Sequence, residues 1–318
     1  MKDLSHLPRM EPSSSTSPAG FHPVDEPRIV NQLIASWDTA RIHDDNLPVA
    51  IPEAGPLRAS WAGMCSRQIW YRLAGTEESN PNDMSSYWRM WLGTAIHDFI
   101  QAVTKESFPQ ALIEEPVNLN QLGMNGSSHV DMIQFDDDGV AEVIEIKSIN
   151  GFGFKKAATR FSGPPEGPRT NAILQAALSA AALSTSREVS GCRLVYLSLE
   201  PVSPNLAYYT DNDLARFTAE WELDIETCIR IGELEAARMQ QVLDAYNLDS
   251  DVPPVGYIVL DTLPELFSIA KIVNPSTGAT VTADGVGGKT WQCAYCNFQD
   301  TCIASQASTV SITKADDQ

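Results

Sequence analysis

The sequence lacks a long apolar run, and this absence argues against a membrane-spanning helix. Its most apolar stretch, residues 172–183, contains Gln175 and Ser179 and falls well short of the roughly 18 to 20 residues that cross a bilayer. The first 20 residues are polar and rich in Ser and Pro, so nothing resembles the apolar segment of a secretory signal. We therefore expect a cytoplasmic protein that does not contact a membrane.

Basic residues are also scarce. Lys and Arg total 22 against 41 Asp and Glu, which gives a formal net charge of −19. A protein that coats duplex DNA by charge usually has the opposite balance. Broad electrostatic binding of DNA is therefore disfavoured, although a local basic cluster or a bound cation can still receive a phosphate chain.

The chain of 318 residues, 43% of them hydrophobic, is long enough for one large core. We expect a disordered arm at 1–28, one domain at 29–303 and a disordered tail at 304–318, because both ends are polar. Within the domain we expect a helical part at 29–110, an α/β core at 111–200, an acidic helix within 201–250 and a cysteine-containing part at 251–303.

Hydrophobic periodicity predicts a mixed α/β fold, in which strands and helices alternate through the core. The expected helices are residues 31–43, 84–106 with Ser85 or Ser86 as N-cap, 170–183 and 213–246. The expected strands are residues 130–135, 140–149 and 193–199, and residues 151–168 are expected to form a loop.

The two central strands carry charges on one face. Glu145 and Lys147 are two residues apart, so their side chains point the same way. A three-residue turn with Gly139 in the left-handed conformation would place Asp131 opposite Glu145, whereas a two-residue turn would place it on the other face. Gly139 favours the first register.

Two carboxylates so close repel unless they share a proton or a cation. Their oxygens suit magnesium or manganese. The alternative is an ordinary buried ion pair of Glu145 with Lys147 and an exposed Asp131. His97 is either a core histidine or part of this site, and Gly93, one turn earlier on its helix face, would allow another group to approach closely.

Several of these residues form an ordered set that resembles the PD-(D/E)XK nucleases of the RecB-like branch. The set comprises Gly93-Thr94-Ala95-Ile96-His97, Asp131, Glu145-Ile146-Lys147 and Gln175. The resemblance implies a restriction-endonuclease-like core in which His97, Asp131, Glu145 and the carbonyl of Ile146 bind Mg²⁺ or Mn²⁺. It also implies that Lys147 positions the attacking water and that Gln175 contacts DNA. The family commonly has Tyr four residues after this Gln, where this chain has Ser179.

Three cysteines fall within ten residues, at Cys293, Cys296 and Cys302, and Cys65 lies far upstream. This density indicates a metal site, and zinc bound by the three with Cys65 or a histidine is one possibility. The arrangement, with Ser60, Arg67 and Tyr71 around Cys65, resembles the iron–sulfur nucleases of the RecB-like branch. That resemblance implies a 4Fe-4S cluster that joins the N-terminal and C-terminal segments.

Basic residues interleave with aromatic ones after the Glu145 strand. Lys155, Lys156 and Arg160 lie among three phenylalanines, a composition that suits phosphate contact and base stacking. We predict that these three basic residues bind DNA.

Together the motifs predict a metal-dependent DNA exonuclease. The resemblance implies a preference for single-stranded ends and a role in DNA recombination, repair or end processing, as for CRISPR-associated and phage-type relatives. It leaves room for a recombination or annealing partner protein. One alternative is a non-catalytic iron–sulfur protein that binds DNA ends, and another is a nuclease stabilised by zinc.

Overall fold

The computed structural model describes residues 55–159, 161, 166–206, 216–248 and 296–302. The chain divides into two units, residues 1–50 and 51–318, and every described residue belongs to the second. The expected terminal arms, the expected helix at 31–43, Arg160 and Cys293 lie outside the described residues.

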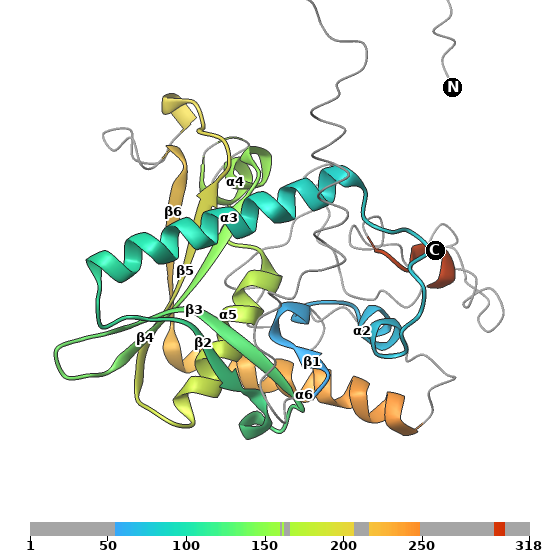
Figure 1. Ribbon diagram of the computed structural model, residues 1–318. Helices are drawn as coiled ribbons and strands as arrows, with labels where there is room; N and C mark the ends of the chain where they lie inside the picture. Colours follow the sequence, from blue (N-terminus) through green and yellow to red (C-terminus); the bar gives the residue numbers. More distant parts are fainter. Residues whose placement is uncertain (1–54, 160, 162–165, 207–215, 249–295, 303–318) are drawn as a thin grey trace, which may run out of the picture. The chain divides into compact units, whose positions relative to one another are not determined.

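The second unit contains a six-stranded mixed sheet flanked by helices, which confirms the expected mixed α/β class (Figure 1). The strands are β1 (Leu57–Arg58), β2 (Leu112–Asn118), β3 (Gly126–Phe135), β4 (Ala141–Ile149), β5 (Val189–Ser198) and β6 (Thr218–Leu223). Their order is β1-β3-β4-β5-β6, and β2 also pairs with β3. The pairs β1·β3 and β4·β5 are parallel, and the others are antiparallel.

Besides these strands, the described residues form α-helices and short 3-10 helices. The α-helices are α2 (Ser66–Leu73), α3 (Met84–Ser107), α4 (Gly151–Ala158), α5 (Thr170–Ser184) and α6 (Ile225–Leu248). The 3-10 helices are η1 (Ala59–Trp61), η2 (Leu119–Leu122) and η3 (Pro204–Leu206). Within the described part of the chain, no helix has both the length and the apolarity needed to cross a membrane.

Helices pack on both faces of the sheet, as the alternation along β4 shows. Val143 and Ile149 join the main core with α5 and α6, whereas Ile144 and Ile146 join a smaller cluster that includes Ile100 of α3. Neighbouring residues of a strand point to opposite faces. The helix α3 therefore covers one face, and α5 and α6 cover the other.

Small residues allow α5 and α6 to approach each other closely. Helix α5 is rich in alanine and almost wholly buried. A Cβ added at Gly232 of α6 would lie 2.3 Å from the carbonyl oxygen of Ala177 on α5, so only glycine fits this crossing. The closely packed helices α5 and α6 cover one face of the sheet whose strands carry the candidate site.

The hairpin β3–β4 has the register of a three-residue turn, which confirms that prediction. Met132 pairs with Ile144 and Phe135 with Ala141, and Asp136 donates its backbone N–H to the carbonyl of Val140 at 3.1 Å. Gly139 has φ of +80°, the left-handed conformation such a turn requires. The regular pairing ends at Met132 and Ile144, and beyond it the backbone N–H of Ile146 donates to the Asp131 side chain at 2.7 Å.

Three secondary-structure predictions need correction. The expected loop at 151–168 contains α4. The expected helix at 213–246 instead comprises β6 and then α6, with Asp224 at the helix start accepting from the backbone N–H of Thr227 at 2.9 Å. The N-cap of α3 is Asp83, whose side chain accepts from the backbone N–H of Ser86 at 2.8 Å, so Ser85 and Ser86 lie inside the helix.

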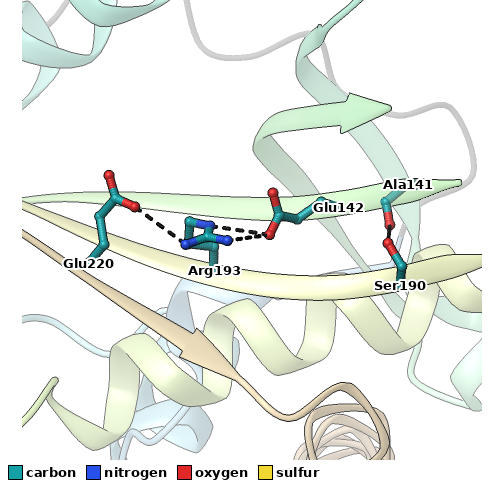
Figure 2. Close-up of polar contacts among 5 residues, drawn as sticks. All are labelled: Ala141, Glu142, Ser190, Arg193 and Glu220. Carbon is teal, nitrogen blue, oxygen red and sulfur yellow. Dashed lines mark hydrogen bonds and ion pairs between the residues drawn. The ribbon is translucent and has the colours of Figure 1, made fainter. Parts of the chain in front are cut away.

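An ion-pair network connects the strands β4, β5 and β6 (Figure 2). Arg193 of β5 donates to Glu142 of β4 at 2.9 and 3.1 Å, and lies 3.4 Å from Glu220 of β6. All three side chains are partly exposed, so the network contributes about 1 kcal/mol or less per pair. Glu142 is thus a paired surface carboxylate on the same strand as Glu145.

Candidate metal centre

Three potential metal ligands meet where α3, β2 and β3 come together. A nitrogen of His97 and carboxylate oxygens of Glu114 and Asp131 lie within 4.8 Å of one another. His97 Nδ1 is 3.7 Å from Asp131 Oδ1. Asp131 is buried and Glu114 is exposed, so the group extends from the interior to the protein surface.

The sequence analysis missed Glu114, and the backbone explains its position. Ile113 pairs with Met132 and Glu115 with Val130, so the register puts Glu114 opposite Asp131. Glu114 has φ of 52°, in the left-handed region that non-glycine residues rarely occupy and that costs of order 1–3 kcal/mol. Such strained residues cluster at functional sites. The only sequence signal was an acidic pair in a short apolar segment that was not predicted to be a strand.

Glu145 and Lys147 form an ion pair on the adjacent strand β4. Glu145 is fully buried; its Oε1 contacts the Lys147 ammonium, whereas its Oε2 accepts no hydrogen bond from a described residue. Lys147 is partly exposed. Buried polar atoms normally have at least one hydrogen-bond partner, so Glu145 Oε2 has unused ligand capacity beside the group of His97, Glu114 and Asp131.

The hairpin ties Asp131 to this pair. The backbone N–H of Ile146 donates to Asp131 Oδ2 at 2.7 Å, which leaves Oδ1 on the side of His97. The residue predicted to ligate through its carbonyl thus orients Asp131 through its N–H. One hydrogen bond from the strand backbone fixes the carboxylate in place.

The electrostatics of the group indicate a shortage of positive charge. Burial raises the pKa of Asp131 to about 6, and burial together with the Asp131 carboxylate raises the pKa of Glu145 to about 7. Burial lowers the pKa of His97, and the Lys147 cation lowers it further. For Lys147, burial opposes the charged form, but the Glu145 and Asp131 carboxylates outweigh burial and raise its pKa. A divalent cation would favour both ionised carboxylates.

The other predicted DNA contacts lie on nearby elements. Lys155 and Lys156 are on α4, which follows β4 directly, and Gln175 is half-buried on α5. Gly93 of α3 approaches β4, because a Cβ added there would lie 2.8 Å from Ser148 Oγ. The close approach expected at Gly93 is therefore present and brings the His97 helix against the strand of Glu145.

A second candidate site lies where the last described segment contacts α2. Cys65 is the N-cap of α2, and Arg67 Nη1 donates to Cys302 Sγ at 3.6 Å. Tyr71 packs against Phe298 with ring centroids 5.4 Å apart, and the backbone N–H of Asn80 donates to the carbonyl of Asn297 at 2.8 Å. Residues 296–302 are thus held beside the helix that follows Cys65.

A buried ion pair of α6 forms hydrogen bonds with the residues on either side of Cys65. Glu235 is fully buried and binds Arg238 through both oxygens, at 2.6 and 2.7 Å. Glu235 also accepts from the backbone N–H of Gly63 at 2.8 Å, and Arg238 donates to Ser66 Oγ at 3.2 Å. Gly63 and Ser66 flank Cys65, so this pair sets the position of that cysteine.

No family model matches the chain, and no curated protein matches it. Among solved structures, the crystal structure of SSO0001 is similar over 87% of this chain and 97% of that chain, at 17% sequence identity and a TM-score of 0.41. A likeness this weak carries no conclusion about function, which must be argued from the residues themselves.

Proposed function

We propose that this protein is a metal-dependent DNA nuclease that hydrolyses phosphodiester bonds. The observation that carries the proposal is the pair of buried carboxylates Glu145 and Asp131, which lie close together beside His97 and Glu114 with Lys147 as the ammonium partner of Glu145. Two buried carboxylates beside one ammonium group are costly unless a further cation or a proton joins them. The arrangement favours a metal centre over an isolated ion pair.

The donors fit magnesium or manganese. Three of the four are carboxylates, which these hard cations prefer, and the imidazole of His97 is also compatible with manganese. A divalent cation held here supplies Lewis-acid activation of a phosphate and of water. Lys147 stays protonated because Glu145 and Asp131 raise its pKa. Its partly exposed ammonium can offset negative charge that develops on the scissile phosphate.

The resemblance to PD-(D/E)XK nucleases supports the same reading. The residues that carry it, His97, Asp131, Glu145 and Lys147, come from three separate elements and lie together. A restriction-endonuclease-like core, a preference for single-stranded ends, a recombination or annealing partner and a cytoplasmic setting follow from the resemblance and are proposed with it.

Wild-type protein is expected to degrade end-labelled DNA when manganese or magnesium is present. Chelation should stop the reaction and manganese should restore it, because the carboxylates alone cannot activate the phosphate. Single-stranded and duplex substrates labelled at either end will report the preference and the direction of digestion. A protein that binds labelled ends but never releases label with either metal would instead be a non-catalytic DNA-end binder.

We also propose that Cys65, Cys293, Cys296 and Cys302 hold a 4Fe-4S cluster. Four thiolates suit such a cluster, and three of these residues belong to segments fixed against each other. When bound, the cluster would fasten the end of the described chain to α2.

Protein purified without oxygen is expected to contain iron and acid-labile sulfide, with an absorbance band that Cys302→Ala strongly reduces. Cys228→Ala is the matched control, since Cys228 is buried in the main core away from α2, and its iron content should equal that of wild type. Zinc with no sulfide would overturn the cluster and leave a zinc-stabilised fold.

A further inference from the structure

An aromatic and basic surface lies directly after the strand of the candidate metal centre. Helix α4 begins at Gly151, two residues after Ile149, and its N-cap Asn150 accepts from the backbone N–H of Gly153 at 2.7 Å. The first residue of α4 is four positions after Lys147, a span of about 13 Å if fully extended. Any group bound on α4 is therefore close to the proposed reaction site.

Two phenylalanine rings are exposed on this surface. Phe152 is 61% exposed and Phe161 is 45% exposed, and their ring centroids are 6.2 Å apart in an edge-to-face arrangement. Full burial of one phenylalanine side chain stabilises a protein or a complex by about 1.5–3 kcal/mol. Two neighbouring rings left in water are therefore a feature that marks binding surfaces.

Each ring has a lysine ammonium above it. Lys156 Nζ lies 5.2 Å from the Phe152 centroid, and Lys155 Nζ lies 5.8 Å from the Phe161 centroid. Three of the eight lysines in the sequence, these two and Lys147, fall within ten residues of a chain with a net charge of −19. Three lysines of this acidic protein therefore lie close together in the sequence, on and directly after the strand of its candidate metal centre.

A third cation adds to the surface. A Cβ added at Gly153 would lie 2.7 Å from Arg169 Nη2, so the guanidinium rests against the middle of α4. One carboxylate is also near: Glu200 Oε2 would lie 2.7 Å from a Cβ at Gly151. Gly151 is the first residue of α4, whereas both lysines are in its last turn. The basic end of the helix therefore lies away from Glu200.

We infer that Phe152, Phe161, Lys155 and Lys156 form a platform that binds single-stranded DNA. The rings can stack on bases and the ammonium groups can contact phosphates, a combination that suits unpaired strands. In a duplex the bases are already stacked, and an acidic peptide would use the lysines but not the ring faces. The choice of DNA rests on the proposed function, whereas the single-stranded character rests on α4 itself.

The test is the affinity for a fluorescent oligothymidine of about 15 nucleotides, a length within typical single-strand sites, measured by anisotropy in chelator. The variant Phe152→Ala/Phe161→Ala should bind it about ten- to a hundredfold more weakly, with little change for a duplex of equal length. Phe108→Ala is the matched control, because Phe108 is comparably exposed at the end of α3, and its affinity should equal that of wild type.

The lysines should affect the salt dependence. Lys155→Gln/Lys156→Gln should reduce the slope of log affinity against log salt by about 1.4, at about 0.7 per phosphate contact on single strands. Arg187→Gln is the control. Arg187 also sits over a ring, 5.6 Å from the Phe135 centroid, but at the opposite end of β4, beside its first residue, and the slope should not change.

Unchanged affinity in the aromatic variant, or an equal loss for duplex, would overturn the platform. Loss of binding to anionic lipid vesicles without an effect on the oligonucleotide would assign the surface to a membrane and also overturn it. Because binding is measured in chelator, the result does not depend on cleavage. A protein without nuclease activity whose aromatic variant loses single-strand binding would contradict the proposed function and support the platform.

Discussion

Glu145→Gln is expected to lower metal-dependent DNA cleavage by about a hundred- to a thousandfold, the usual loss when one electrostatic group of a reaction site is removed. The substitution keeps the shape of the side chain and removes its charge. Glu145 is fully buried and is ion-paired with Lys147, so the neutral amide would weaken this pairing and remove the carboxylate offered to a cation. Initial rates on labelled single-stranded DNA with saturating manganese measure the effect.

Glu142→Gln is the matched control for this prediction. Glu142 lies three residues earlier on β4 and is paired with Arg193 in the surface network of Figure 2. Its replacement should leave the cleavage rate unchanged and alter the free energy of unfolding by no more than about 1 kcal/mol. Equal losses in the two variants would show a general effect of charge on β4, and full activity in Glu145→Gln would rule out the proposed centre.

Glu235→Ala is expected to lower the free energy of unfolding by about 3–5 kcal/mol. The substitution leaves Arg238 buried without its carboxylate and removes the acceptor of the Gly63 N–H. Urea unfolding of metal-free protein, followed by far-UV circular dichroism, measures this change. Glu233→Ala on the exposed side of the same helix is the control and should change stability by less than about 0.5 kcal/mol.

A double variant separates the ion pair from simple packing. Glu235→Met/Arg238→Met should be more stable than Glu235→Ala, because no charge is left alone in the interior. If Glu235→Ala melts like Glu233→Ala, the pair does not hold the Cys65 segment. If the double variant is as unstable as the single one, the loss comes from packing and the hydrogen bond to Gly63.

The central hairpin was predictable because its determinants are local. Gly139 can adopt the left-handed conformation at low cost, and this selects the three-residue turn that fixes the register. The alternation of Val143, Glu145 and Lys147 then sets which side chains share a face. The placement of Asp131 beside Glu145 follows from these few residues alone.

The missed parts depend on contacts between distant segments. Glu114 joins His97 and Asp131 only because β2 pairs with β3 and the backbone turns at that residue, which no local pattern indicates. The strand β6 was assigned to a helix because its Glu220 and Glu222 suggested an acidic helix face, although its alternation with Trp221 fits an edge strand. Nothing in the sequence indicated that Glu235 and Arg238 form a buried ion pair, because acidic helix faces are usually solvated.

The turn at residues 136–139 has a consequence for tolerance to change in length. Exposed loops usually accept insertions and deletions, because few contacts depend on them. Here the turn length sets the pairing of β3 with β4, so the loss of one residue would rotate Glu145 and Lys147 away from Asp131. Substitution at Asp137 or Asp138 leaves that spacing intact. Among the turn residues, Asp137 and Asp138 therefore tolerate substitution better than Gly139 tolerates it, and none of the turn positions tolerates deletion.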